Sequence, residues 1–136
     1  MSAHPRVTVM VVDDEPRVCQ LMENILAEEG YCVTTATSGQ QALTLAAQAR
    51  PDVILLDIVM SGLDGVATLR ELRKQGHRGA VAMLTAHGTL QTAREAMMLG
   101  AYDYITKPCE LELLRSVVRE GIQEGVVGRR APACAR

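Results

Sequence analysis

The chain has 136 residues, 48% of them hydrophobic and 22% charged, which is enough for one domain with a substantial apolar core. Its 14 basic and 16 acidic residues give a formal net charge of −2, and it contains no Phe, no Trp and three Tyr. This composition supplies neither a cationic field nor a base-stacking surface, so it argues against a nucleic-acid or anionic-membrane partner.

Strand-forming and helix-forming segments alternate along the chain. The strand-forming segments are short runs of β-branched and aliphatic residues, and each is followed by apolar residues at helical spacing. Parallel strands need helical crossovers, so this order predicts a parallel sheet between two helical layers. The expected strands are residues 7–12, 32–35, 53–56, 80–84 and 104–105, and the apolar faces of the expected helices begin with Val18, Ala42, Val66, Leu90 and Leu111.

The expected fold is an α/β doubly wound (βα)5 sandwich of the flavodoxin-like kind. We expect a five-stranded parallel sheet in the order 2-1-3-4-5, although the spacing alone leaves other doubly wound orders open. The domain should occupy residues 6–123, after a short lead at residues 1–5. Two glycines and Pro132 are expected to break any further helix, so residues 124–136 predict a flexible tail.

The start of the first helix and the state of the cysteines are also predicted. Asp14 or Glu15 is placed to cap this helix, and Pro16 suits its first turn. The apolar segment before these acids is too short for a signal peptide or a membrane span, so we expect a cytoplasmic protein. The four cysteines form no CxxC pair, and we expect them to be reduced.

Polar residues follow four of the five expected strands. Ligands of doubly wound sheets bind beyond the carboxyl ends of the strands, so these residues are candidates for a site. Each one alone is explained by a helix cap, a turn or a solvated loop. Their convergence on one edge instead favours a phosphoryl-transfer site. The residues are Asp13, Asp14, Asp57, Thr85 and Lys107.

The three carboxylates of this set indicate a divalent cation. At 4 Å, two like charges repel by about 4 kcal/mol at an effective dielectric constant of 20. A hard cation removes that repulsion. Because the candidate ligands are oxygens, with no His or Cys among them, we expect Mg²⁺.

The joint pattern resembles the receiver domain of bacterial two-component response regulators, over about residues 6–123. The matching features are the Asp13-Asp14 pair, an apolar strand that ends in Asp57, Thr85 followed by Ala, and Lys107 followed by Pro. TAHG and GAYDYITKP look most like receivers of the nitrogen-regulation class of enhancer-binding regulators.

The resemblance implies that Asp57 accepts a phosphoryl group from a sensor histidine kinase or a histidine phosphotransfer protein. It implies that Asp14 and Asp57 bind Mg²⁺ directly, that Asp13 acts largely through a metal-bound water, and that the backbone carbonyl of Val59 is a further ligand. The chain would catalyse only its own phosphorylation and dephosphorylation, and would not be an enzyme in the ordinary sense.

The resemblance also assigns the residues around the phosphoryl group. Lys107 and Thr85 would bind phosphoryl oxygens, and the peptide bond to Pro108 would be cis. When Thr85 moves toward the phosphate, Tyr104 would swing inward and change the surface of the fourth helix, fifth strand and fifth helix. The alternative is that Tyr104 is a fixed, half-buried strand residue. The changed surface would contact a downstream effector protein or a second copy of the chain, with no direct role for nucleic acid or membrane.

Some positions depart from the pattern of the family. Ser61 stands where Pro is common, and Cys109 stands where Phe is common. Val59 and His87 lie two residues beyond the acceptor and the Thr, where the resemblance implies that they flank the path of an attacking water. The apolar Val59 predicts slow loss of the phosphoryl group, and His87 would oppose this by holding a water.

Three other functions were weighed against a stand-alone receiver, which we favour. One is a receiver fragment of a longer DNA-binding transcription regulator. A haloacid-dehalogenase-like phosphatase would need an acid where Val59 stands. A flavodoxin-like flavin binder would need a phosphate-cradling first loop, and residues 13–15 are all acidic.

Overall fold

The computed structural model describes residues 7–86, 89–107 and 110–134. The predictions for His87, Cys109 and the peptide bond to Pro108 therefore lie outside the described residues, as does the N-terminal lead. The strands are β1 (Thr8–Val12), β2 (Cys32–Ala36), β3 (Val53–Asp57), β4 (Ala80–Thr85) and β5 (Asp103–Thr106), and the helices are α1 (Pro16–Glu28), α2 (Gly39–Ala49), α3 (Gly65–Lys74), α4 (Leu90–Met98) and α5 (Leu111–Cys134).

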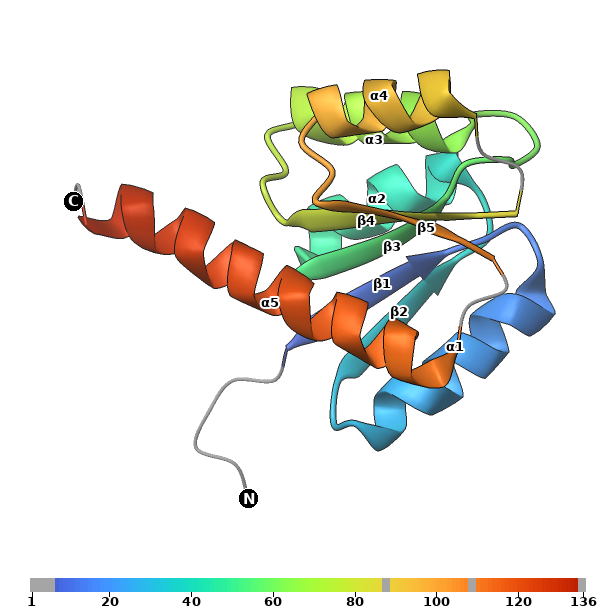
Figure 1. Ribbon diagram of the computed structural model, residues 1–136, viewed down its shortest axis with the longest axis horizontal. Helices are drawn as coiled ribbons and strands as arrows, with labels where there is room; N and C mark the ends of the chain where they lie inside the picture. Colours follow the sequence, from blue (N-terminus) through green and yellow to red (C-terminus); the bar gives the residue numbers. More distant parts are fainter. Residues whose placement is uncertain (1–6, 87–88, 108–109, 135–136) are drawn as a thin grey trace.

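The five strands form one parallel sheet in the order β2-β1-β3-β4-β5, which confirms the predicted topology. Helices α1 and α5 cover one face, and α2, α3 and α4 cover the other (Figure 1). The chain reverses its winding direction between β1 and β3. The carboxyl ends of these two strands therefore lie side by side at the switch point of the sheet.

The core consists of two aliphatic layers, one on each face of the sheet. Along β1, Val9 and Val11 pack toward α1 and α5, whereas Met10 and Val12 pack toward the other three helices. All four side chains are fully buried or nearly so. Burying a side chain of this kind stabilises the fold by roughly 1.5–3 kcal/mol. The central strands are thus held firmly, and so are the residues at their ends.

The turn from β3 to α3 is packed directly against the end of the strand. The backbone N–H of Gly65 donates a hydrogen bond to the carbonyl of Ile58 at 2.8 Å. A Cβ at position 65 would lie 2.1 Å from the carbonyl oxygen of Asp57, so only glycine fits. Asp64 caps α3 through its side chain. This close approach fixes the backbone that carries Asp57.

The start of α1 differs from the expectation. Pro16 is the first helical residue and Glu15 is the N-cap, but the Glu15 side chain makes no capping hydrogen bond. Instead, Oδ1 of Asp13 accepts the N–H of Glu15 at 2.9 Å. An aspartate two residues before an N–H readily forms this local turn. Glu15 thus occupies the predicted N-cap position and Pro16 the predicted first turn, but the side chain that orders the start of the helix is that of Asp13.

The predicted end of α5 is also wrong. The helix runs for 24 residues to Cys134, and Figure 1 shows its last turns extending beyond the sheet. A glycine weakens a helix by about 1 kcal/mol relative to Ala but does not forbid it. Pro132 has no N–H to donate, and the helix nonetheless continues to Cys134. Of the helices in the described residues, none is both long and apolar enough to cross a membrane.

Candidate functional site

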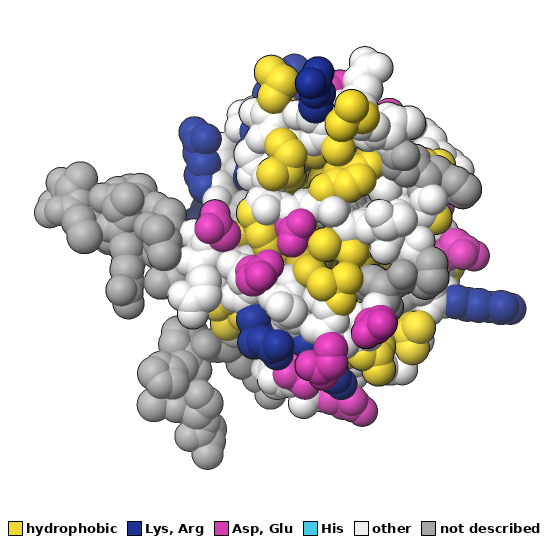
Figure 2. All heavy atoms as spheres, viewed as in Figure 1, with side chains coloured by type: hydrophobic (Ala, Val, Ile, Leu, Met, Phe, Trp, Pro, Cys, Tyr) yellow, Lys and Arg dark blue, Asp and Glu magenta, His cyan; other side chains and the backbone are white. Residues whose placement is uncertain are grey.

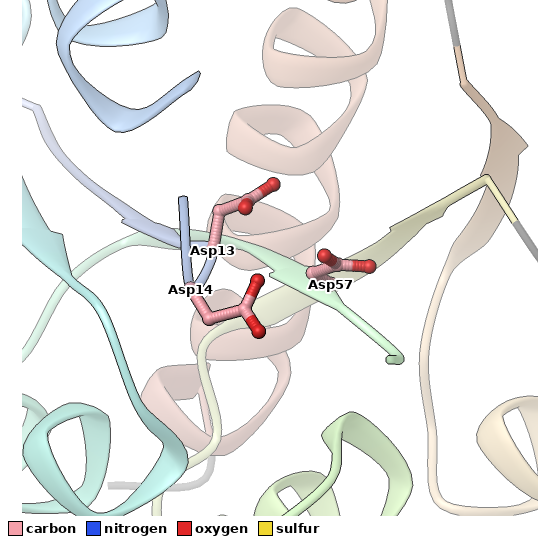
Figure 3. Close-up of side chains that lie close together, drawn as sticks. All are labelled: Asp13, Asp14 and Asp57. Atoms are coloured by element: carbon pink, nitrogen blue, oxygen red, sulfur yellow. The ribbon is translucent and has the colours of Figure 1, made fainter. Parts of the chain in front are cut away.

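Three carboxylates meet at the switch point of the sheet. One ligand oxygen of each of Asp13, Asp14 and Asp57 lies within 4.8 Å of the others. Figure 3 shows the three side chains gathered where β1 and β3 end. Asp13 and Asp57 are only 2% and 8% exposed, whereas Asp14 faces solvent. The structure thus brings together the three acids that the sequence predicted.

Lys107, from the segment after β5, reaches into the same cluster. Its Nζ contacts Oδ2 of Asp13 and lies 3.4 Å from Oδ2 of Asp57. The backbone N–H of Lys107 donates to the carbonyl of Thr85 at 2.8 Å, which fixes the start of this segment. One ammonium group therefore faces two nearly buried carboxylates.

The cluster contains more negative than positive groups, since three carboxylates face one ammonium group. Burial raises the pKa of Asp57, and the charge of Asp13 adds to this, although Lys107 and a backbone hydrogen bond from Val59 oppose it. Burial alone would lower the pKa of Lys107, but hydrogen bonds and charges from Asp13 and Asp57 outweigh it, so that pKa is raised. A single ammonium cannot neutralise three carboxylates. The cluster has the charge and the all-oxygen ligands that suit a divalent cation.

Thr85, the last residue of β4, is 1% exposed. Asp57 pairs with Leu84 across the sheet, so Thr85 lies one position beyond Asp57 on the neighbouring strand. The N-cap of α4 is Thr89, so Thr85 does not cap this helix. The alternative that Thr85 serves only as a helix cap is therefore excluded.

Tyr104, on β5, is half-buried, and its hydroxyl lies 3.2 Å from Oγ1 of Thr92 in the first turn of α4. Thr92 also forms a reciprocal capping box with Thr89. The sequence interpretation considered Tyr104 but missed Thr92. Two threonines three residues apart, before an amphipathic segment, would have signalled the cap, though not the contact with a tyrosine on another element.

The structure also shows where Val59 lies. The side chain of Val59 is 52% exposed in the loop after the acceptor strand, and the assignment of its carbonyl to a metal stays a prediction.

Cys19 and Cys32 are free thiols. The Sγ of Cys19 donates to the carbonyl of Asp13 at 3.3 Å. Burial and the charge of Asp13 raise the pKa of Cys19, which keeps it a neutral thiol behind the acidic cluster.

A parallel sheet with three acids and a lysine at the carboxyl ends of its strands is typical of one class of signalling proteins. Residues 9–119 match the family described as "Response regulator receiver domain". Because that match covers most of its length, the chain belongs to the receiver family of two-component response regulators. Receiver domains of this family act between histidine kinases and downstream effectors.

Relatives and solved structures agree with this assignment. The chain is 37% identical over 115 residues to "Regulatory protein AtoC" of Escherichia coli (strain K12), covering 85% of this chain and 25% of AtoC. It is 36% identical over 117 residues to "Nitrogen assimilation regulatory protein NtrX" of Azorhizobium caulinodans, covering 85% of this chain and 26% of that protein. The receiver domain of NtrX from Brucella abortus superposes with a TM-score of 0.78 at 37% identity, covering 85% of this chain and 98% of that one. The chain thus spans about a quarter of the length of these two curated relatives.

Proposed function

We propose that the chain receives a signal by accepting a phosphoryl group on Asp57 from a histidine kinase or a phosphotransfer protein, with Mg²⁺ as cofactor. The observation that carries this proposal is the nearly buried Asp57 carboxylate, held between two other acids and the ammonium group of Lys107. The family membership supports the same chemistry.

The contacts favour Asp57 over Asp13 as the acceptor. Oδ1 of Asp13 accepts the N–H of Glu15, and Oδ2 is in close contact with Lys107. Asp13 is thus held by two partners. Asp57 also has two partners, the backbone N–H of Val59 and Lys107, but Lys107 lies farther from it, at 3.4 Å, so its contact with the ammonium group is the looser of the two.

The residues of the cluster fit a magnesium site. Asp14 and Asp57 would bind the cation directly, Asp13 would act through a water, and the carbonyl of Val59 would add a further oxygen. Mg²⁺ commonly binds one or two carboxylates together with waters and phosphoryl oxygens. When bound, it would neutralise the negative charge between the acceptor and the incoming phosphoryl group.

The chemistry of this chain is mainly positioning. An oxygen of Asp57 forms a bond to phosphorus as the N–P bond of the donor phosphohistidine breaks, and the electron pair of that bond returns to the imidazole nitrogen. Lys107 and Thr85 would hold two phosphoryl oxygens and so limit the geometries that react. Water attack on the same phosphorus reverses the signal. The chain would then catalyse only its own phosphorylation and dephosphorylation.

The signal would leave through the surface of α4, β5 and α5. Movement of Thr85 toward the phosphoryl group would let Tyr104 turn inward, and the tyrosine would give up its bond to Thr92. Apolar side chains gather over α4 in the upper half of the view in Figure 2. Such a surface suits protein contact, either with an effector or with a second copy of the chain. The exposed large apolar residues of α4 are Leu90, Met97 and Met98.

Other assignments are less well supported. A phosphatase acting on small esters needs an acid two residues beyond its nucleophile, and Val59 cannot transfer protons. We propose that residues 6–123 form the receiver unit, whether the chain acts alone or as part of a longer transcription regulator. In both cases the phosphorylated state is read through protein contacts.

The acceptor is tested by intact-mass spectrometry after incubation with acetyl phosphate and Mg²⁺. The unmodified sequence should gain one phosphoryl group, and chelation of the metal should prevent this. Asp57→Asn should gain none. Asp64→Asn is the matched control, since it changes an exposed aspartate in the next loop and keeps a capping side chain. Unchanged labelling of Asp57→Asn would overturn the assignment.

A further inference from the structure

A second concave site lies at the opposite end of the sheet from Asp57. It is a cavity of about 780 Å³ between the carboxyl-terminal ends of α2 and α3 and the loops that lead into β3 and β4. Ala46, Ala47 and Pro51 contribute apolar lining, and Arg50 and Arg78 contribute guanidinium groups. Its size falls within the range of small-molecule sites in proteins, about 300–1,000 Å³.

The side chain of Arg73 fixes the loop between α3 and β4, and the backbone of this loop packs closely against the loop between α2 and β3. Nη1 of Arg73 donates to the carbonyls of His77 and Gly79 at 2.9 and 3.1 Å, and its Nε donates to the carbonyl of Leu99 at 2.8 Å. A Cβ at Gly79 would lie 2.8 Å from the carbonyl oxygen of Pro51. The two loops are thus pressed together, and the cavity exists before any ligand arrives.

The arginines around this cavity have contrasting environments. Arg73 donates to four backbone carbonyls. The backbone N–H of Arg50 donates to the carbonyl of Ala46, but the side chains of Arg50 and Arg78 form no hydrogen bond or ion pair with any residue that the structure describes. The one carboxylate in the lining, Asp52, accepts the N–H of Thr8 at 2.8 Å. Burial and the nearby charge of Arg78 lower the pKa of Arg73, as expected for two guanidinium groups that lie near each other.

The backbone of Arg50 adds an independent observation. Arg50 ends α2 in the left-handed conformation, with φ of 47°. The other described residues with positive φ are Gly30, Gly62, Gly76 and Gly100. A side chain at such a position destabilises the backbone by roughly 1–2 kcal/mol, and glycine is the usual helix end. A costly arginine where glycine would serve the fold better points to a function for its side chain.

We propose that this cavity binds a small oxyanion of the phosphate class, carrying at least two negative charges, through Arg50 and Arg78. The guanidinium fork matches the oxygen spacing of phosphate and can donate two parallel hydrogen bonds. Both arginines are exposed, so their guanidinium groups are accessible to such a ligand. This site is separate from the acidic cluster and does not depend on the role proposed for Asp57.

The test uses pyrophosphate as the probe and the full chain at 150 mM salt, with a chelator present so that no metal links the probe to the acidic cluster. Binding is followed by NMR titration. The backbone amides of residues 50, 52 and 75–79 should shift together and saturate. Arg50→Gln and Arg78→Gln should each weaken binding by about tenfold. Arg94→Gln, which alters an exposed arginine on α4, should bind as the unmodified chain does.

Arg50→Gly separates a binding role from a structural one. If Arg50 serves a ligand, this variant should unfold at a higher urea concentration and yet bind pyrophosphate more weakly. If Arg50 serves the fold, the variant should be less stable. Lower stability of Arg50→Gly, equal affinity in the two Gln variants, or shifts spread over the whole surface would each overturn the proposal.

Discussion

The hydroxyl of Tyr104 on β5 lies 3.2 Å from Oγ1 of Thr92 in the first turn of α4. The same Thr92 oxygen accepts the N–H of Thr89 at 3.0 Å, within the capping box of the helix. The position of the tyrosine ring and the start of α4 therefore depend on one hydroxyl group. An inward movement of Tyr104 would remove one partner of that hydroxyl and leave the first turn of α4 less firmly held.

This coupling predicts the effect of removing either hydroxyl. Thr92→Val keeps the shape of the side chain but loses its half of the capping box and the contact with Tyr104, so the first turn of α4 should exchange its amide hydrogens faster, by about 1 kcal/mol in local stability. Tyr104→Phe should give a smaller change in the same amides, because only one hydrogen bond is lost. Hydrogen exchange followed by NMR measures both.

Thr92→Ser is the matched control, because it keeps the hydroxyl and should preserve most of the protection. In the double variant the two effects should be less than additive, because both single changes break the same bond. Full additivity, or normal exchange in Tyr104→Phe, would show that the two residues are independent.

Lys107 should compete with a divalent cation for the acidic cluster. Its ammonium contacts Asp13 and Asp57, which are also candidate ligands. Removing it in Lys107→Ala leaves the carboxylates mutually repelling, so the variant should bind Mg²⁺ several-fold more tightly and still be phosphorylated poorly. Isothermal titration calorimetry and mass spectrometry measure the two effects.

Lys74→Ala provides the comparison, since Lys74 pairs with Glu71 on the surface of α3, away from the cluster. It should leave both properties unchanged. Loss of Mg²⁺ binding in Lys107→Ala would mean that the lysine organises the carboxylates and does not compete for them.

Val59 should set the lifetime of the phosphorylated form. Its half-exposed side chain stands two residues beyond Asp57 and offers no group that could orient a water. Val59→Asn and Val59→Glu should therefore shorten the lifetime, with each tenfold change corresponding to about 1.4 kcal/mol in the barrier. Decay of the phosphorylated mass after donor removal gives the rate.

Ser61→Asn places the same amide farther along the loop and should have little effect on that rate. The idea fails if both Val59 variants decay as slowly as the unmodified chain. A marked slowing in His87→Ala would instead identify the histidine as the residue that controls hydrolysis.

Gly65 should be intolerant of any side chain. In Gly65→Ala the new methyl group would meet the carbonyl of Asp57, so we expect a loss of about 2–3 kcal/mol in the free energy of unfolding. Urea denaturation measures it. Gly30→Ala isolates backbone strain, because Gly30 has φ of 94° and nothing lies within 4 Å of an added Cβ. It should lose roughly 1–2 kcal/mol. A wild-type stability for Gly65→Ala would mean that the turn can move away from the acceptor strand.

Much of this architecture was predictable because it rests on local patterns. Runs such as residues 53–56 are continuously apolar since β3 is buried on both faces, and the sequence marks where such a run ends at Asp57. Contacts between elements far apart in the chain leave no pattern in the sequence from which they could be predicted. The carbonyls around Arg73 belong to two loops, and their approach depends on how those loops close. The bond between Tyr104 and Thr92 arises in the same way, from the packing of α4 beside β5.

The contact between Lys107 and Asp13 joins residues 94 positions apart in the chain. The aspartates lie at the ends of two strands from the first half of the chain, whereas the lysine follows β5, which is the last strand in the sequence and lies at an edge of the sheet. A chain that is incomplete or only partly folded therefore has the acids without their cation. The complete cluster of carboxylates and ammonium group is in this way tied to completion of the fold.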